Sequence, residues 1–75
     1  MRTYVRMLFH TEGAEPGDIV DIMQELGFEP SLGTHDFVYV WNGKKTAIDE
    51  VLALIGKMHK RMKGLNLSYE ITTVM

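Results

Sequence analysis

Phe37-Val38-Tyr39-Val40-Trp41 is a run of five consecutive apolar residues, all of types that favour β-strands. A strand with one face in water alternates apolar and polar side chains. This strand cannot do so, because its valines occupy one face and its large aromatic side chains occupy the other. Both faces of the predicted strand therefore need cover.

The chain around this strand is short, with 75 residues and no cysteine. A domain of this size buries only about 60% of the surface that its unfolded chain exposes. Neither a disulfide nor a thiolate metal site can supplement such a core, which leaves self-association as the common supplement. We expect residues 1–75 to form one domain without a cofactor.

Composition also restricts the cellular setting and the partners that we expect. No apolar run approaches the roughly 20 residues of a membrane span. Arg2 and Arg6 interrupt the first apolar residues, which is not the pattern of a secretory signal. We therefore expect a cytoplasmic protein that does not contact membranes. The net charge of −2 argues against nucleic acid as a partner, because its binders usually carry a basic surface.

Hydrophobic periodicity and turn residues predict the elements on either side of the central run. Pro16 suits the first turn of a helix, Gly27 suits its left-handed exit, and Pro30 confines a strand to a sheet edge. The predicted elements are a strand at 4–10, a helix at 16–26, a short strand at 28–32, a strand at 36–41, a helix between the N-cap Thr46 and Gly64, and a strand at 67–73.

This order of elements is typical of the α+β, ferredoxin-like βαββαβ sandwich, in which two helices cover one face of an antiparallel sheet. The strands at 4–10 and 36–41 would then be adjacent, central and antiparallel. If residues 28–32 form only a loop, a three-stranded βαβαβ domain remains.

The orientation of the strand at 36–41 decides which side chains lie on the helix-free face. If Val38 and Val40 turn towards the helices, the aromatic side chains cluster on the open face. A buried aromatic side chain accounts for about 150–250 Å², so this cluster would exceed the few hundred Å² that mark a binding surface. If the aromatic side chains turn inward, the two valines join Tyr4 and Leu8 outside. The residues predicted at an interface are Tyr4, Arg6, Leu8, Phe37, Tyr39 and Trp41.

Three uses of this face are open. The first is association into a homo-oligomer, sheet against sheet or edge against edge. The second is a stacking platform for single-stranded nucleic acid that uses Tyr4, Tyr39, Trp41 and Arg6, although the strand at 36–41 lacks the basic and glycine residues of ribonucleoprotein-type strands. The third is a small apolar ligand held between the sheet and a partner.

Residues 16–28, Pro-Gly-Asp-Ile-Val-Asp-Ile-Met-Gln-Glu-Leu-Gly-Phe, resemble the first loop and helix of ACT-type regulatory domains. In that family a Pro-Gly pair opens an aliphatic helix that ends in Leu-Gly before the next strand. The resemblance implies a similar order of elements, association through sheets, and an amino acid or similar small metabolite bound near the first loop. It places Glu12, Gly13 and Gly17 near such a ligand site.

Groups that could carry chemistry are few. His10, Glu12, His35 and Asp36 fall where one strand ends and its antiparallel neighbour begins, so they are candidates for a metal or acid–base site. The serines have no recognisable Ser-His-acid setting. No catalytic residue is predicted, and we interpret the chain as a non-enzymatic, self-associating domain that holds a small metabolite at a subunit boundary.

The end of the second predicted helix is basic. Its cations, which include Lys57, Lys60, Arg61 and Lys63, are interpreted as a solvated surface that complements the carbonyl end of the helix. Contact with phosphate or with an acidic partner is the alternative. His59, which lies among them, is expected to titrate in solvent.

Overall fold

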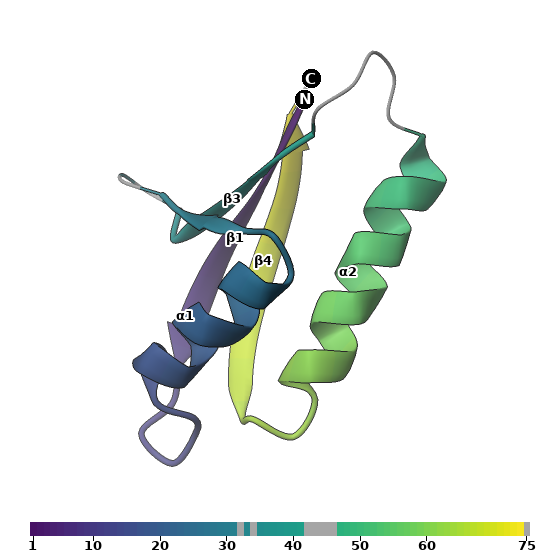
Figure 1. Ribbon diagram of the computed structural model, residues 1–75. Coiled ribbons are helices and arrows are strands. Elements are labelled where there is room, and N and C mark those ends of the chain that lie inside the picture. Colours follow the sequence, from purple (N-terminus) through teal and green to yellow (C-terminus); the bar gives the residue numbers. More distant parts are fainter. Residues whose placement is uncertain (32, 34, 42–46, 75) are drawn as a thin grey trace.

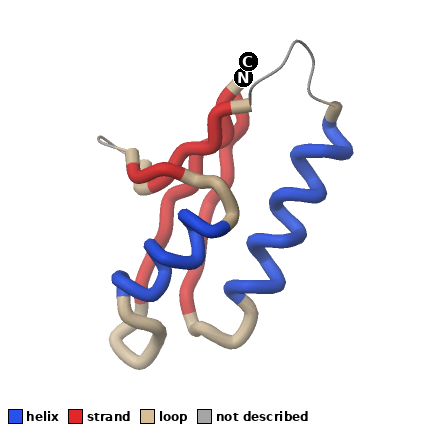
Figure 2. The backbone as a smooth tube through the Cα atoms, viewed as in Figure 1, coloured by secondary structure: helices blue, strands red, loops and turns tan. Residues whose placement is uncertain are grey.

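The computed structural model describes residues 1–31, 33, 35–41 and 47–74. These residues form four strands and two helices (Figures 1 and 2). In chain order the elements are β1 (Arg2–Phe9), α1 (Pro16–Glu25), β2 (Glu29–Pro30), β3 (Phe37–Val40), α2 (Ile48–Met62) and β4 (Leu67–Val74).

The strands form one antiparallel sheet in the order β2-β3-β1-β4. Val5 of the central strand β1 lies opposite Phe37 of β3 and opposite Ile71 of β4. The two sheet edges differ greatly, because β2 has two residues and β4 has eight. The predicted α+β class and four-stranded antiparallel sheet are confirmed. The three-stranded alternative is wrong, because Pro30 of β2 pairs with Phe37.

Both helices lie on the same face of this sheet (Figure 1). Side chains from α1 and α2 join one core with side chains from β1 and β3. Successive side chains of a strand point to opposite faces, so the core residues of β1 and β3 mark the helix-covered face. The buried members of this core are Val5, Met7, Ile19, Met23, Phe28, Phe37, Leu54, Met58 and Met62.

Local signals set the ends of α1 where the sequence predicts them. Pro16 occupies the first turn, and Leu26 caps the other end by donating its N–H to the carbonyl of Ile22 at 3.1 Å. Gly27 follows with φ +96°, a left-handed conformation that favours glycine. A Cβ at Gly27 would also lie 2.9 Å from a ring carbon of Tyr39. The helix exit therefore needs glycine for its backbone angle and for the space above it.

The other helix, α2, begins without a side-chain cap. Its N-cap residue is Ala47, whose extended backbone (φ −74°, ψ 150°) is suitable for a cap but whose methyl group cannot accept a hydrogen bond. The predicted N-cap, Thr46, lies outside the described residues. At the other end, His59, Lys60 and Arg61 occupy the last turn, as the charge pattern predicts.

Candidate functional site

The aromatic side chains of β3 face the helices. Phe37 lies opposite Val5 and Tyr39 lies opposite Thr3, and both of these β1 residues belong to the covered face. Phe37 is only 4% exposed, and Tyr39 packs against the core together with Trp41. Of the two orientations that the sequence leaves open, the structure has the one in which the aromatic side chains turn inward.

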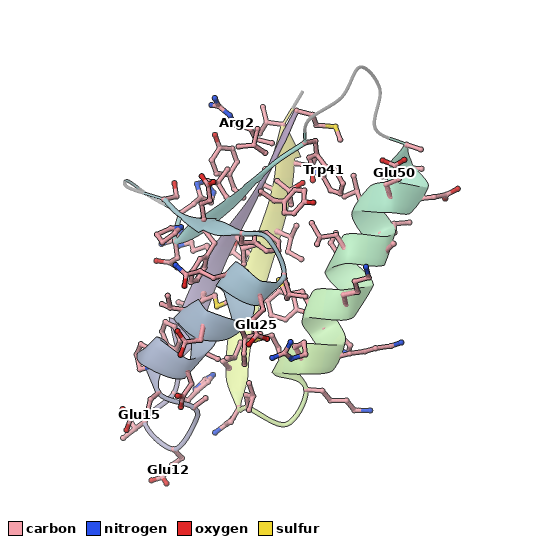
Figure 3. All side chains as sticks on the ribbon, in the orientation of Figure 1. Arg2, Glu12, Glu15, Glu25, Trp41 and Glu50 are labelled. Atoms are coloured by element: carbon pink, nitrogen blue, oxygen red, sulfur yellow. The ribbon has the colours of Figure 1, made fainter. Side chains whose placement is uncertain are left out.

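The predicted six-residue interface is consequently wrong as a single surface. Its aromatic members Phe37, Tyr39 and Trp41 lie on the covered side of the sheet, whereas Tyr4, Arg6 and Leu8 lie on the open side. Figure 3 shows the side chains of Trp41 and Arg2 pointing in opposite directions, with Trp41 directed towards α2. Burial of the larger side chains beneath the helices removes more apolar area from water than burial of the valines would.

A hydrogen-bonded chain that runs through the buried residue Thr3 holds Trp41 in this orientation. Its indole N–H donates to the hydroxyl oxygen of Thr3 at 2.8 Å. Thr3 is fully buried, and its hydroxyl lies 3.0 Å from that of Thr73 on β4. The indole N–H can only donate, so the Thr3 oxygen accepts from Trp41, and either hydroxyl can be the donor between Thr3 and Thr73. Sequence reasoning missed this role, since the three residues are far apart along the chain.

The open face of the sheet mixes apolar and charged side chains. Leu8, Val40 and Val74 are 54%, 45% and 52% exposed. Arg2 lies opposite both valines and separates them, and the ring of His35 lies over that of Tyr4 with centroids 5.0 Å apart. The open-face residues of β1, β3 and β4 are Arg2, Tyr4, Arg6, Leu8, Val38, Val40, Ser68, Glu70, Thr72 and Val74.

This composition also affects the nucleic-acid alternative. That alternative requires Tyr4, Tyr39 and Trp41 to stack bases on one surface. Only Tyr4 lies on the open face, because the other two rings face the helices. The predicted stacking platform is therefore divided between the two sides of the sheet.

The candidate metal or proton-transfer residues do not converge, because β3 is much shorter than β1. Asp36 lies beside the middle of β1, where its N–H donates to the carbonyl of Val5 at 3.0 Å and its carboxylate accepts the N–H of Met7 at 2.7 Å. His10 follows the far end of β1, which pairs only with β4. Among residues 1–31, 33, 35–41 and 47–74, no group of three or more His, Asp or Glu could hold a metal ion.

The first loop packs tightly against the turn between α2 and β4. Ala14 donates its N–H to the carbonyl of Leu65 at 3.1 Å. A Cβ at Gly13 would lie 2.5 Å from the carbonyl oxygen of Asn66, so only glycine fits between the two segments. The structure thus explains Gly13 by close backbone packing.

The other predicted ligand residues, Glu12 and Gly17, lie in open positions. Glu12 is exposed, and Figure 3 shows its side chain at the outer tip of the loop. Nothing lies within 4 Å of a Cβ placed on Gly17. Two cavities among the described residues, one where α2 turns into β4 and one beside Arg2 and Tyr4, are lined by other residues. The metabolite site that the resemblance implies near these residues stays a prediction.

The eight-residue strand β4 leaves its outer backbone edge free, since no described strand lies beyond it. In β1, Val5 and Met7 bond Asp36 and thus turn their backbone groups towards β3. Backbone groups alternate between the two edges of a strand, so Tyr4 turns towards β4 and bonds Thr72. The β4 residues with outward N–H and C=O groups are consequently Leu67, Tyr69, Ile71 and Thr73.

An exposed apolar row lies on the side of α2 near this edge. Ile48 and Leu52 are 69% and 57% exposed, and Ile55 is half-buried. Their spacing of four and three residues places them in one row along the helix. The next residue of the row is His59, whose Nδ1 lies 2.9 Å from the hydroxyl oxygen of Tyr69 on β4. We name Ile48, Leu52 and Ile55 the α2 row.

An open cavity of about 510 Å³ lies where α2 turns into β4. His59 belongs to its lining and is exposed, and its Nδ1 contacts the hydroxyl of Tyr69. The turn between the two elements bends through Gly64 and Asn66, which have φ of 85° and 53°. The lining residues are His59, Met62, Lys63, Gly64, Asn66, Leu67 and Tyr69.

Among the described residues, no helix combines the length and the apolar character needed to cross a membrane. Comparisons with family models, with curated proteins and with solved structures give no match to this chain. The resemblance to ACT-type domains therefore depends on residues 16–28 alone and stays a prediction.

Proposed function

We propose that this chain is a self-associating domain in which two copies pair through the free edge of β4. The observation that carries the proposal is an eight-residue edge strand beside the exposed α2 row. An unpaired strand edge offers a row of N–H and C=O groups to another strand. Pairing would therefore join two four-stranded sheets into one.

The composition of β4 favours such pairing. Proteins protect free edges with proline, lysine, bulges or very short strands. The other edge of this sheet has that protection, because β2 is two residues long and contains Pro30. The sequence of β4, Leu-Ser-Tyr-Glu-Ile-Thr-Thr-Val, contains neither proline nor lysine. Self-association through β4 thus uses the unprotected edge.

The charges of β4 suit a second copy of the same strand. Glu70 is the only charged residue of this strand. An antiparallel pair centred on Ile71 places Glu70 opposite Thr72 of the second copy, so no like charges are opposed. In this register the outward backbone groups of Ile71 bond those of its copy, and those of Tyr69 bond those of Thr73.

The α2 row would be buried by the same arrangement. α2 connects β3 to β4 and contacts β4 through His59, so it covers the β1–β4 half of the sheet. Strands lie about 4.8 Å apart, which places α2 and its copy about two strand spacings, or about 10 Å, apart. Packed helices lie about 8–10 Å apart. Leu52 of one copy can then pack against the α2 row of the other.

The charges of α2 also favour this arrangement. Its first turn carries Asp49 and Glu50, whereas its last turn carries His59, Lys60 and Arg61. The two-fold symmetry of the pair makes the helices antiparallel, so the acidic turn of each copy approaches the basic turn of the other. The two helix dipoles are then antiparallel, so the positive end of each lies beside the negative end of the other.

The fold assignment belongs to the same proposal. The order of elements and the sheet order β2-β3-β1-β4 support a ferredoxin-like arrangement, with α1 and α2 on one face. A small metabolite that binds only the associated form would stabilise that form by mass action. The domain would then have a regulatory role.

The experiment measures molar mass against concentration by light scattering for wild type and two matched variants. We expect the wild-type mass to rise from 8.6 kDa towards twice that value. Leu52→Glu should weaken association by about tenfold or more, because it places a carboxylate in the apolar contact. Leu8→Glu is the control, since Leu8 is similarly exposed but lies on the open face. This control should leave the dissociation constant within about twofold.

A second pair of variants tests the strand edge itself. Thr73→Pro removes an outward N–H, whereas Thr73→Ala removes the same hydroxyl but keeps that N–H. We expect dissociation in the proline variant alone. A wild type that stays monomeric at high concentration, or a greater loss of association in Leu8→Glu than in Leu52→Glu, would contradict the proposal.

A further inference from the structure

The cavity at the turn between α2 and β4 has the dimensions of a small-molecule site. Its volume of about 510 Å³ lies within the roughly 300–1,000 Å³ of typical ligand pockets. It is formed by two elements and the turn between them. Met62 and Leu67 supply apolar surface, and four polar side chains lie around it. Those four are His59, Lys63, Asn66 and Tyr69.

The polar part of the lining suits a negative charge. Lys63 carries a full positive charge, Asn66 offers amide donors, and no Asp or Glu is among the lining residues. The hydroxyl of Tyr69 contacts His59 Nδ1. When that hydroxyl donates to Nδ1, or when the ring is protonated, the opposite ring nitrogen Nε2 carries a hydrogen. In either of these two states, His59 is a second donor to a ligand.

One electrostatic effect opposes an anion here. The carbonyl end of a helix carries about half a negative charge, and α2 ends at this cavity. This partial charge is reduced, because one terminal carbonyl, that of His59, already accepts the backbone N–H of Lys63 at 2.9 Å. The full charge of the Lys63 ammonium group exceeds the remainder, so the lining stays favourable for an anion.

The first loop holds the cavity in shape. Gly13 packs directly against the carbonyl of Asn66, and Ala14 bonds the carbonyl of Leu65. The Leu65-Asn66 segment is therefore fixed from behind by the chain between β1 and α1. Such support makes the cavity a preformed part of the fold, which lowers the ordering cost of binding.

We infer that this cavity binds a small organic oxyanion, with the carboxylate or phosphate group near His59, Lys63 and Asn66 and an apolar body against Met62 and Leu67. The lining has no arginine, so the charge is met by single-point contacts and not by a bidentate guanidinium pair. The inference does not depend on the proposed self-association, because all lining residues come from one copy.

The test follows amide chemical shifts by nuclear magnetic resonance while a probe is added. The probes are benzoate and phenyl phosphate, with benzyl alcohol as a neutral probe of similar shape. We expect saturable shifts at Met62, Lys63, Asn66 and Leu67 with at least one anion, and much weaker binding of the alcohol. Benzoate and phenyl phosphate together show which oxyanion is preferred.

The matched variants are Lys63→Gln and Lys57→Gln, which change the net charge equally, at the C-cap of α2 and within α2. Lys57 does not line the cavity. We expect Lys63→Gln to weaken anion binding by roughly three- to fivefold, and Lys57→Gln to leave it nearly unchanged. Equal losses in both variants, absence of saturable shifts, or equally tight binding of benzyl alcohol would overturn the inference.

The self-association variant Leu52→Glu separates this inference from the proposed function. It lies outside the cavity, so it should bind the anion with the wild-type affinity whether or not it associates. Loss of binding in Leu52→Glu would overturn the claim that one copy contains the whole site.

Discussion

At the scale of single residues, Gly13 and Gly17 separate a packing role from a ligand role. Gly13→Ala would place a Cβ 2.5 Å from the Asn66 carbonyl oxygen and 2.8 Å from that of Leu65. Both atoms belong to backbone and cannot rotate away. We expect the free energy of unfolding to fall by about 1–3 kcal/mol, the usual cost of overpacking, as measured by urea denaturation.

Gly17→Ala is the matched control for this prediction. Gly17 lies in the first turn of α1, and nothing is within 4 Å of a Cβ placed on it. Alanine suits a helix better than glycine, so the variant should be neutral or up to about 1 kcal/mol more stable. Equal destabilisation by both variants would show that the contact between Gly13 and the Asn66 turn is not the cause.

At the scale of elements, the N-terminus of α2 lacks a side-chain cap, so a substitution there can increase stability. Ala47 has the backbone of an N-cap but makes no side-chain cap hydrogen bond. Ala47→Ser would supply that oxygen and complete a Ser-x-x-Glu capping box with Glu50, three residues later. We expect the midpoint of urea unfolding to rise, with about 1 kcal/mol of added stability.

Ala53→Ser controls for the serine itself. Ala53 is exposed in the interior of α2, where serine has a lower helix propensity than alanine and no orphan N–H to cap. This variant should lose up to about 0.5 kcal/mol. A decrease in stability for Ala47→Ser as well would mean that α2 does not begin at Ile48.

At the scale of the whole molecule, the shared core and not the ion pair holds the two helices together. Arg61 of α2 lies 2.7 Å from Glu25 of α1, but these side chains are 44% and 61% exposed. Figure 3 shows Glu25 between the two helices. Exposed pairs contribute only about 0–1 kcal/mol because water and salt screen them. Met58 is fully buried in the common core.

Two variants compare these contributions by urea denaturation. Met58→Ala should lower the free energy of unfolding by about 2–5 kcal/mol, through lost apolar burial and the cavity left behind. Glu25→Gln should lower it by less than about 1 kcal/mol, and high salt should reduce that difference further. A Glu25→Gln effect as large as that of Met58→Ala would mean that charge pairing dominates the helix packing.

The elements could be predicted because their signals are local. Pro16 and Gly27 mark the ends of α1 through backbone angles that do not depend on distant residues. Pro30 predicts an edge strand because it lacks an N–H. The alternation of Leu67, Tyr69 and Ile71 likewise predicts β4 and its half-buried face.

The candidate sites could not be predicted in the same way, because each depends on residues brought together through space. The metal candidates assume strands of equal length, whereas β3 begins opposite the middle of β1 and leaves His10 beyond it. The first-loop site assumes free space around Gly13, whereas the Asn66 turn fills it. The cavity beside His59 depends on the meeting of α2 and β4, which no short motif records.

By itself, the sequence determined the order of strands and helices, the ends of α1 and the apolar character of both faces of β3. Only the tertiary structure decided that the aromatic side chains of β3 face the helices. The pattern from Phe37 to Trp41 is apolar on both sides, so periodicity cannot choose between them. The observed orientation buries the larger apolar side chains beneath the helices, and there the buried Thr3 hydroxyl accepts the indole N–H of Trp41.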